Sequence, residues 1–237
     1  MAEIRRFKNR TQAGTLLAKR LARHAHSPDA IVLALPRGGV PVAFAIAQRL
    51  GIGLDILIVR KLGMPRHEEF AMGAVGSNGV RVLQPGLPGL IGVTQQDIDA
   101  VTARELAELE RRERAYRGSR APLALAGRCA ILVDDGVATG STMLAAIEVA
   151  RRMRPRTLEL AIPVAPPDTV DALRPHVDAL VCLQAPSLFR SVGQWYEEFG
   201  QTSDEEVQNL LARAWAAPPP QPTGESNDEA TDDGHQP

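Results

Sequence analysis

CAILVDDGVATGSTM, at residues 129–143, places an apolar run, two acids and a loop of small residues in direct succession. The uninterrupted apolar run at 129–133 is typical of a buried β-strand, and a helical pattern begins at Met143. Asp134 and Asp135 stand where the strand would end. Ligands of open α/β sheets bind at the carboxyl ends of strands. The stretch therefore predicts a strand, a loop and a helix with a binding site at the loop.

The loop itself is suited to an anion. Between Gly136 and Thr142 only Val137 carries a bulky side chain, so backbone N–H groups can close around a phosphate, with the helix N-terminus behind them. The hydroxyls of Ser141 and Thr142 add donors. The alternative is an ordinary strand–turn–helix, in which the acids cap the helix and a glycine shapes the turn.

A second unit of the same kind precedes the first. An apolar strand is predicted at 30–35 and a helix at 42–50, and the sequence PRGGVP separates them. Arg37 offers a positive charge to this loop, while Gly38 and Gly39 allow close approach of the backbone to a ligand. A simple Gly-Gly turn is the alternative.

The segment 129–143 resembles the phosphoribosyl-pyrophosphate (PRPP) motif of type I phosphoribosyltransferases, which is an apolar strand, two acids and then Ala-Thr-Gly-x-Thr. The resemblance implies that the loop holds the 5′-phosphate of PRPP. It also implies that Asp134 and Asp135 serve the ribose hydroxyls and a bound Mg²⁺, the metal in part through water. The loop residues that inherit the phosphate role are Ala138, Thr139, Gly140, Ser141 and Thr142.

The loop with Arg37, Gly38 and Gly39 is similar to the pyrophosphate loop of that family, where a non-proline cis peptide is common; one is expected near Arg37–Gly38. A third apolar run, 55–59, is followed by Arg60 and Lys61. Two cations at a strand end can meet a pyrophosphate or simply be solvated. The family resemblance favours pyrophosphate contact for both and implies a catalytic role for Lys61.

The Gly- and Pro-rich segment 63–92 contains two short strand patterns around the turn Ser77-Asn78-Gly79, which predicts a hairpin. In the family a flexible loop here closes over the substrate and excludes water. His67, Glu68 and Glu69 lie in this segment, and exposed loop charges are the simpler interpretation of them.

The remaining pattern predicts a phosphoribosyltransferase-like α/β fold, a parallel sheet flanked by helices with a hairpin flexible loop and a small C-terminal hood. A charged helix at 94–117, capped by Thr94, is expected to be solvated or to face another subunit. The hood, at about 184–202, holds four aromatic residues that either form a wall for a planar ring or anchor the segment. One domain is expected at 1–215, with the flexible loop and inserted helix at about 63–117, and a disordered tail at 216–237.

Composition narrows the class of protein. The 237 residues are 44% hydrophobic with a formal net charge of −1, so overall charge favours neither nucleic acid nor membrane as a partner. The two cysteines, Cys129 and Cys182, lie in apolar runs and are predicted to be buried small side chains without a disulfide. His24 and His26 are expected at the surface. Without an apolar leader or membrane-length segment, a cytoplasmic protein is expected.

The resemblance implies transfer of the 5-phosphoribosyl group of PRPP to a nucleobase-like nitrogen acceptor, with release of pyrophosphate, Mg²⁺ as cofactor and a homodimer as the assembly. Family members acting on 6-oxopurines usually carry Asp directly before Thr-Gly, whereas this sequence has Ala138, as adenine- and uracil-type enzymes do. The acceptor therefore stays open. The alternative is a non-catalytic regulator on the same fold that senses PRPP or a nucleotide.

Overall fold

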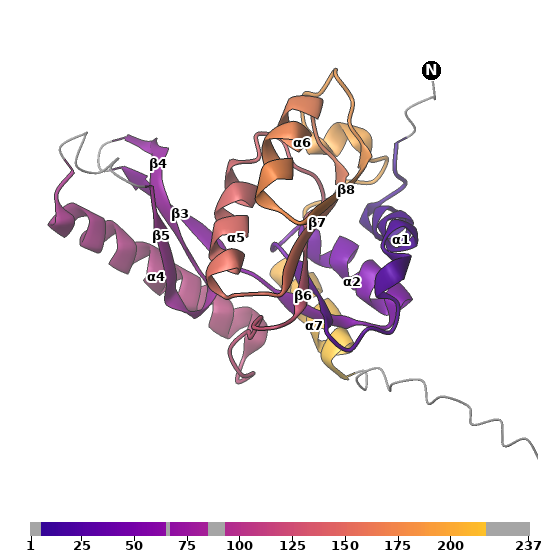
Figure 1. Cartoon of the computed structure of the whole chain (residues 1–237), viewed down its shortest axis with the longest axis horizontal. Helices are drawn as coiled ribbons and strands as arrows, with labels where there is room; N and C mark the ends of the chain where they lie inside the picture. Colours follow the sequence, from indigo (N-terminus) through magenta and orange to yellow (C-terminus); the bar gives the residue numbers. More distant parts are fainter. Residues whose placement is uncertain (1–5, 65–66, 85–92, 217–237) are drawn as a thin grey trace, which may run out of the picture.

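The strands form two sheets in the computed structural model, which describes residues 6–64, 67–84 and 93–216. A five-stranded sheet has the order β2-β1-β6-β7-β8 with all neighbours parallel, and a three-stranded antiparallel sheet has the order β3-β4-β5. The smaller sheet and the long helix α4 extend to one side of the larger sheet (Figure 1). The fold is thus the predicted parallel sheet flanked by helices, with the predicted hairpin beside it.

The elements follow the predicted order closely. The parallel strands are β1 (Ala30–Ala34), β2 (Gly53–Ile56), β6 (Cys129–Val133), β7 (Thr157–Val164) and β8 (Ala179–Gln184). The antiparallel strands are β3 (Val59–Met64), β4 (His67–Gly76) and β5 (Val80–Leu83). The helices are α1 (Arg10–Arg20), α2 (Gly39–Leu50), α4 (Gln95–Arg117), α5 (Ser141–Arg152), α6 (Pro167–Leu173) and α7 (Asp204–Ala216), with short 3₁₀ turns at Ala22–His24, Ser77–Gly79, Arg174–His176 and Val192–Trp195.

Helices cover both faces of the parallel sheet, which explains why its central strands are apolar throughout. All five residues of β6 are buried. Ile131 and Val133 belong to a core shared with α1, α2 and α7, whereas Ala130 and Leu132 belong to a second core shared with α5 and α6. Successive side chains of one strand therefore supply two separate cores.

The strand order places a switch point between β1 and β6. The chain leaves β1 through α2 and returns to β2 on one side, while it leaves β6 through α5 and returns to β7 on the other. Helices α2 and α5 lie on opposite faces of the sheet, and the loops that lead into them, after β1 and β6, meet at its carboxyl edge. This is the place where open α/β sheets bind ligands.

The hairpin differs from the prediction at its start. Arg60 and Lys61 do not end a strand of the parallel sheet but lie inside β3, the first strand of the antiparallel sheet. The parallel strand β2 stops at Ile56, and two more buried residues, Leu57 and Ile58, lead into β3. Because the apolar run continues through this junction, hydrophobicity alone did not reveal where one sheet ends and the other begins.

Helix α4 packs against the hairpin. Thr94 caps it as predicted, accepting from the Asp97 backbone N–H, and the Asp97 side chain accepts from Thr94 in return. Its apolar stripe, including Ile98 and Leu109, is buried against β3 and its neighbours. The helix is therefore solvated on one face only.

At the C-terminal end, α7 begins after Ser203, whose hydroxyl accepts from the Glu206 backbone N–H, and it includes Ala216. The rest of the predicted tail, the side chains of residues 67–69 and part of the predicted flexible loop lie outside the described residues. No helix in the described part of the chain is long and apolar enough to cross a membrane. Cys129 and Cys182 are both free thiols; Cys129 is buried as predicted, whereas Cys182, on the edge strand β8, is only half-buried.

A buried ion pair joins α4 to the parallel sheet. Arg117, the last residue of α4, bonds the Asp55 carboxylate on β2, and both side chains are less than a tenth exposed. Arg117 also donates to the Ala121 carbonyl at 2.5 Å. Burial raises the pKa of Asp55, and the Arg117 guanidinium opposes that rise. Removing one partner of such a pair leaves an uncompensated buried charge.

Arg117→Leu is expected to destabilise the protein by about 3–5 kcal/mol at neutral pH, because Asp55 loses its cation. The variant raises the folded-state pKa of Asp55 further above its unfolded value. The penalty is therefore smallest below about pH 4 and grows as the pH rises through the folded pKa. Urea unfolding at pH 5 and pH 8 measures this difference.

The control is Arg156→Leu, which removes the exposed Arg156–Asp29 pair and should cost no more than about 1 kcal/mol. An equal loss of stability in the two variants, or a pH-independent loss in Arg117→Leu, would contradict the assignment.

Candidate active site

Two carboxyl groups lie side by side at the carboxyl end of β6. Asp134 and Asp135 are both partly buried, and the Asp135 backbone N–H donates to the Asp134 side chain at 2.8 Å. Burial and the neighbouring charge of Asp135 raise the pKa of Asp134 well above its ordinary value. Burial also raises the pKa of Asp135, against the opposing effect of the Arg10 guanidinium. The pair thus favours a proton or a bound cation over two bare negative charges.

The loop after β1 lies directly against this pair. A Cβ atom added to Gly38 would stand 2.1 Å from Oδ2 of Asp135, and one added to Gly39 would stand 2.7 Å from the Val133 carbonyl oxygen. Only glycine fits this approach. The peptide bond Pro36–Arg37 is cis, one bond before the place where the sequence predicted a cis bond. The two loops predicted from separate motifs therefore form one site.

The small-residue loop after Asp135 is open to solvent. Ala138, Thr139, Ser141 and Thr142 are exposed, whereas Gly140 is buried and has a φ of 78°, in the left-handed region that favours glycine. Gly140 precedes the first turn of α5, whose N-terminal N–H groups have no side-chain cap. This arrangement presents backbone donors and hydroxyls at a helix N-terminus, where anions bind favourably.

Lys61 reaches this loop from the hairpin. Its ammonium group donates to the Ser141 hydroxyl at 2.7 Å, and that hydroxyl lies 3.2 Å from the Thr139 hydroxyl. On the other side, the Thr169 hydroxyl donates to the Ala138 carbonyl at 2.7 Å. The contacts bring Lys61 to the predicted phosphate loop, while its predicted role toward pyrophosphate stays a prediction.

Arg10 is a site residue that the sequence analysis missed. It begins α1, and its Nε and Nη2 each lie 2.8 Å from Oδ2 of Asp135. Its Nη1 donates to the Gly200 carbonyl at 2.7 Å, and its guanidinium lies 4.0 Å from the centre of the Phe199 ring. Arg10 stood within a basic N-terminal run that carried no motif, so no sequence signal linked it to an acid 125 positions away.

The aromatic hood segment is anchored to the site. The Tyr196 hydroxyl donates to the Asp135 carbonyl at 2.5 Å, and its ring contacts Phe7 and Phe199. Burial raises the pKa of Tyr196, so the phenol stays a donor. Of the two interpretations of these aromatics, the anchoring one applies to Tyr196. Phe199, which is more than a third exposed, still presents ring surface beside Arg10.

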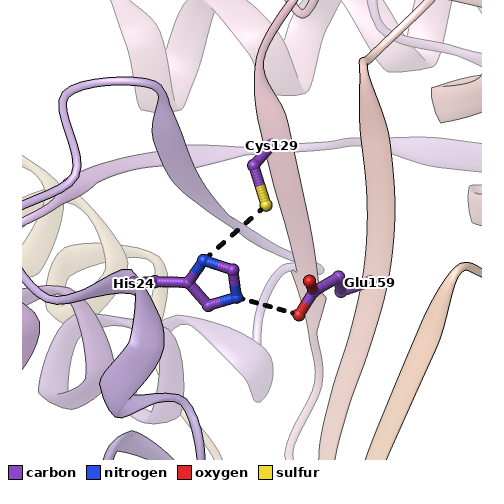
Figure 2. A group of neighbouring side chains, drawn as sticks. All are labelled: His24, Cys129 and Glu159. Atoms are coloured by element: carbon purple, nitrogen blue, oxygen red, sulfur yellow. Dashed lines mark hydrogen bonds and ion pairs between the residues drawn. The ribbon is translucent and has the colours of Figure 1, made fainter.

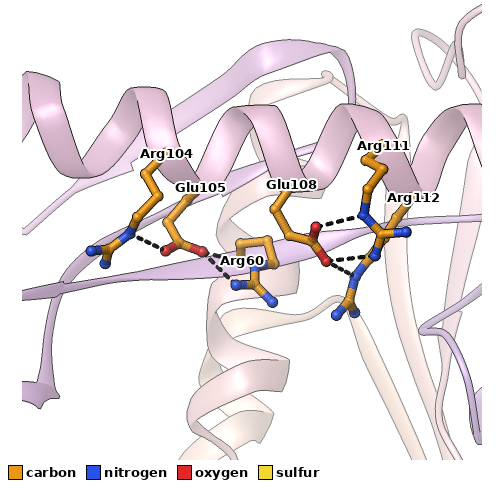
Figure 3. Close-up of polar contacts among 6 residues, drawn as sticks. All are labelled: Arg60, Arg104, Glu105, Glu108, Arg111 and Arg112. Carbon is orange, nitrogen blue, oxygen red and sulfur yellow. Dashed lines mark hydrogen bonds and ion pairs between the residues drawn. The ribbon is translucent and has the colours of Figure 1, made fainter.

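Arg60 and Arg37, both predicted phosphate ligands, lie beside carboxylates in this structure. Arg60 pairs with Glu105 of α4, with N–O distances of 2.6 and 2.8 Å, as Figure 3 shows. Nearby on the same helix Glu108 accepts from Arg111 and Arg112. Arg37 lies at the site but its Nη1 is 3.7 Å from an Asp204 carboxylate oxygen. Their substrate roles remain predictions.

Comparison with known proteins decides the family. A family model described as a phosphoribosyl transferase domain matches residues 2–194. The chain belongs to the phosphoribosyltransferase family. A protein of Mycobacterium tuberculosis, provisionally named a phosphoribosyl transferase and recorded in two strains, is 46% identical over 208 residues, which are 88% of this chain and 47% of that protein. The chain thus spans about half the length of the curated relatives it matches.

A solved structure supports the fold of this chain over nearly its whole length. The crystal structure of TT1426 from Thermus thermophilus is 43% identical in sequence and superimposes with a TM-score of 0.79. The match covers 88% of this chain and 98% of the other. The family assignment made from residues 129–143 is therefore confirmed.

A second cluster of chemically active side chains lies at the opposite, amino end of the parallel sheet. The His24 ring stands between Cys129 and Glu159, with Nδ1 3.9 Å from Sγ and Nε2 3.0 Å from a Glu159 oxygen (Figure 2). Arg23 also contacts Glu159, at 2.5 Å. His24 was predicted at the surface, but its side chain is only 12% exposed. The ring is held inside by its contact with the buried Glu159 carboxylate.

By spacing the cluster could hold a metal ion, because one ligand atom from each residue lies within 4.8 Å of the other two. In this structure the two ring nitrogens of His24 face different partners, Cys129 and Glu159 (Figure 2). Burial raises the pKa of the Cys129 thiol, which keeps it protonated rather than a thiolate ligand. The group is best understood as hydrogen bonding that satisfies a buried Glu159.

Asp134→Asn is expected to stabilise the protein at pH 8. The folded pKa of Asp134 is raised, so stability is full below the unfolded pKa of about 4 and is lost as the pH rises through the folded value. Asn preserves the neutral shape without this loss. We expect a gain of about 1 kcal/mol or more at pH 8 that disappears near pH 4, measured by urea unfolding.

Asp178→Asn is the control of opposite sign. Hydrogen bonds from Arg151 and from the Leu158 backbone lower the pKa of Asp178. That variant should be less stable than the parent protein at pH 8 and equal to it at strongly acid pH. Destabilisation by Asp134→Asn at pH 8 would show that the carboxyl is ionised and satisfied in the folded protein.

Proposed function

We propose that this protein transfers the 5-phosphoribosyl group of PRPP to a nitrogen atom of a nucleobase-like acceptor and releases pyrophosphate. The observation that carries the proposal is the contact between the Gly38 loop and Asp135 at the switch point, beside the exposed loop of Thr139 and Ser141. A sugar bearing phosphates at two positions needs two anion-binding loops with hydroxyl acceptors between them. The family supports the reaction class, and the acceptor is part of the proposal.

The acidic pair suits Mg²⁺. This cation takes oxygen ligands and is usually held by one or two carboxylates together with substrate phosphates and water. Asp134 and Asp135 supply two such groups; burial raises the pKa of both, with the neighbouring charge of Asp135 adding to the rise at Asp134, and a bound cation would favour the ionised pair. When bound, Mg²⁺ would neutralise charge on the leaving pyrophosphate.

Backbone and side-chain groups of the protein would bind the phosphates of PRPP. The backbone N–H groups at the start of α5 and the hydroxyls of Thr139, Ser141 and Thr142 would hold the 5′-phosphate. Lys61, already bonded to Ser141, would add a positive charge to the loop. The amides of Gly38 and Gly39 and the side chain of Arg37 would meet the charge that develops on pyrophosphate. Electrostatic stabilisation of a leaving group in this way is a large contributor to rate.

A non-catalytic sensor of PRPP or a nucleotide is the second candidate, and the Arg10–Asp135 contact favours it. With two guanidinium nitrogens at 2.8 Å, Arg10 takes up part of the negative charge that a metal would use. A protein that only senses a ligand can keep this contact as its resting state. An enzyme must displace or share it in every cycle.

A panel of purine and pyrimidine bases with PRPP and Mg²⁺ distinguishes the two candidates. The enzyme releases pyrophosphate with at least one base, at a rate that depends on both PRPP and metal. Binding of PRPP by calorimetry without release for any base would support the sensor. Absence of both binding and release would reject both.

Asp134→Asn combined with Asp135→Asn is expected to weaken Mg²⁺-dependent PRPP binding at least tenfold, because the paired carboxylates are the proposed contacts for metal and ribose. Calorimetry with and without Mg²⁺ measures the change. Asp178→Asn, far from the site on an exposed pair with Arg151, should bind as the parent protein does. Undiminished affinity in the double variant would overturn the assignment of these residues.

A further inference from the structure

A groove of about 590 Å³ lies at the amino end of the parallel sheet, away from the Asp134 site. It is bordered by the start of β2, the loop before β1, the residue before β6, and helices α2 and α7. Its volume is in the range of small-molecule sites. Its floor contains apolar side chains such as Ile31, Ile52 and Leu54. The space thus suits a ligand larger than a simple ion.

Three arginines line this groove: Arg120, Arg128 and Arg213. None of them forms an ion pair with a residue in the described ranges, although Arg128 donates to the Ala30 carbonyl at 3.3 Å. The single acid in the lining is Asp55, which Arg117 already holds. Positive charge therefore gathers around a concave surface without a matching negative charge.

Aromatic rings fix two of these arginines in place. The Arg120 guanidinium lies 4.3 Å from the centre of the Trp215 ring, and that of Arg213 lies 4.8 Å from the centre of the Phe44 ring. Trp215 is itself anchored, since its indole N–H donates to the Leu54 carbonyl at 2.9 Å. A guanidinium stacked on a ring keeps its N–H donors free at its edge. Such donors match phosphate oxygens, and little conformational entropy is lost on binding.

We propose that the groove is a second binding site, separate from the PRPP site, for a phosphorylated compound that carries a planar ring, of the size of a nucleoside monophosphate. The arginines would hold the phosphate, and the apolar floor with Phe44 and Trp215 would contact the ring. Neither feature alone selects this class: inorganic phosphate would leave the apolar floor unused, and a neutral base would leave the three charges unmatched. The proposal does not depend on catalysis at Asp134.

The test uses the fluorescence of Trp215. Trp195 and Trp215 are the two tryptophans of the chain, so Trp195→Phe leaves one reporter inside the groove. Titration of this protein with AMP, without Mg²⁺, should give a saturable change in emission. Adenosine and inorganic pyrophosphate should each bind at least tenfold more weakly, because each supplies half of the required contacts.

Arg120→Gln with Arg213→Gln in this background should weaken AMP binding tenfold or more, since hydrogen bonds to charged groups are lost. Arg20→Gln with Arg152→Gln removes two exposed charges elsewhere and should leave the affinity unchanged. Asp134→Asn with Asp135→Asn should also leave it unchanged, which separates this site from the PRPP site. If the double arginine variant does not fold, Arg128→Gln alone should weaken binding severalfold.

Three results would overturn the proposal. They are no saturable change in emission with AMP, equal weakening of AMP binding by both pairs of arginine variants, and an emission change that follows protein concentration instead of ligand concentration. The third would show that a second copy of the chain covers the groove.

Discussion

The approach of the loop after β1 to the acids after β6 is the constraint on which the site depends. A backbone that leaves no room for a Cβ at Gly38 fixes where the Asp135 carboxyl can lie. The approach is possible because β1 and β6 are neighbours in the sheet, while α2 and α5 leave it on opposite faces and do not compete for the same space. It also has a cost, because two carboxyls become partly desolvated next to one another and their pKa values rise. Ionisation of both carboxyl groups is thus unfavourable in the folded chain, and a cation bound between them would make it favourable.

Arg10 offsets part of this cost and ties distant segments to the acids. Its guanidinium contacts Asp135, the Gly200 carbonyl and the Phe199 ring, so the first helix, the site and the hood meet at one side chain. Tyr196 also joins the hood to the acids, because its hydroxyl donates to the backbone carbonyl of Asp135. The hood is therefore positioned by the same residue that the PRPP motif supplies. A ligand that draws Asp135 away from Arg10 would loosen the hood as well.

The features that could be predicted from the sequence are those specified by a local pattern of residues. The run at 129–133 and the Thr94 cap each specify a structure within a few residues, and both predictions are confirmed. The glycines at 38 and 39 allow a close approach to Asp135, while their role toward a ligand stays a prediction. The missed features depend on pairing between distant positions. Arg10 with Asp135, Arg60 with Glu105, and Arg117 with Asp55 become visible only after the chain is folded. The break between β2 and β3 was missed for another reason, because buried residues on both sides of it share one apolar run.

The net charge of −1 also illustrates the limit of composition. A nearly neutral total gave no reason to expect anion binding, yet the fold separates charge between the two ends of one sheet. At the carboxyl end, main-chain donors and hydroxyls form the proposed anion site, beside two acids that would hold a cation. At the amino end, the arginines that lie over Phe44 and Trp215 form the second proposed anion site, with side chains alone. The first proposed site depends on strand–loop–helix geometry, so a sequence motif indicates it. The second depends only on the convergence of separate elements, which no motif indicates.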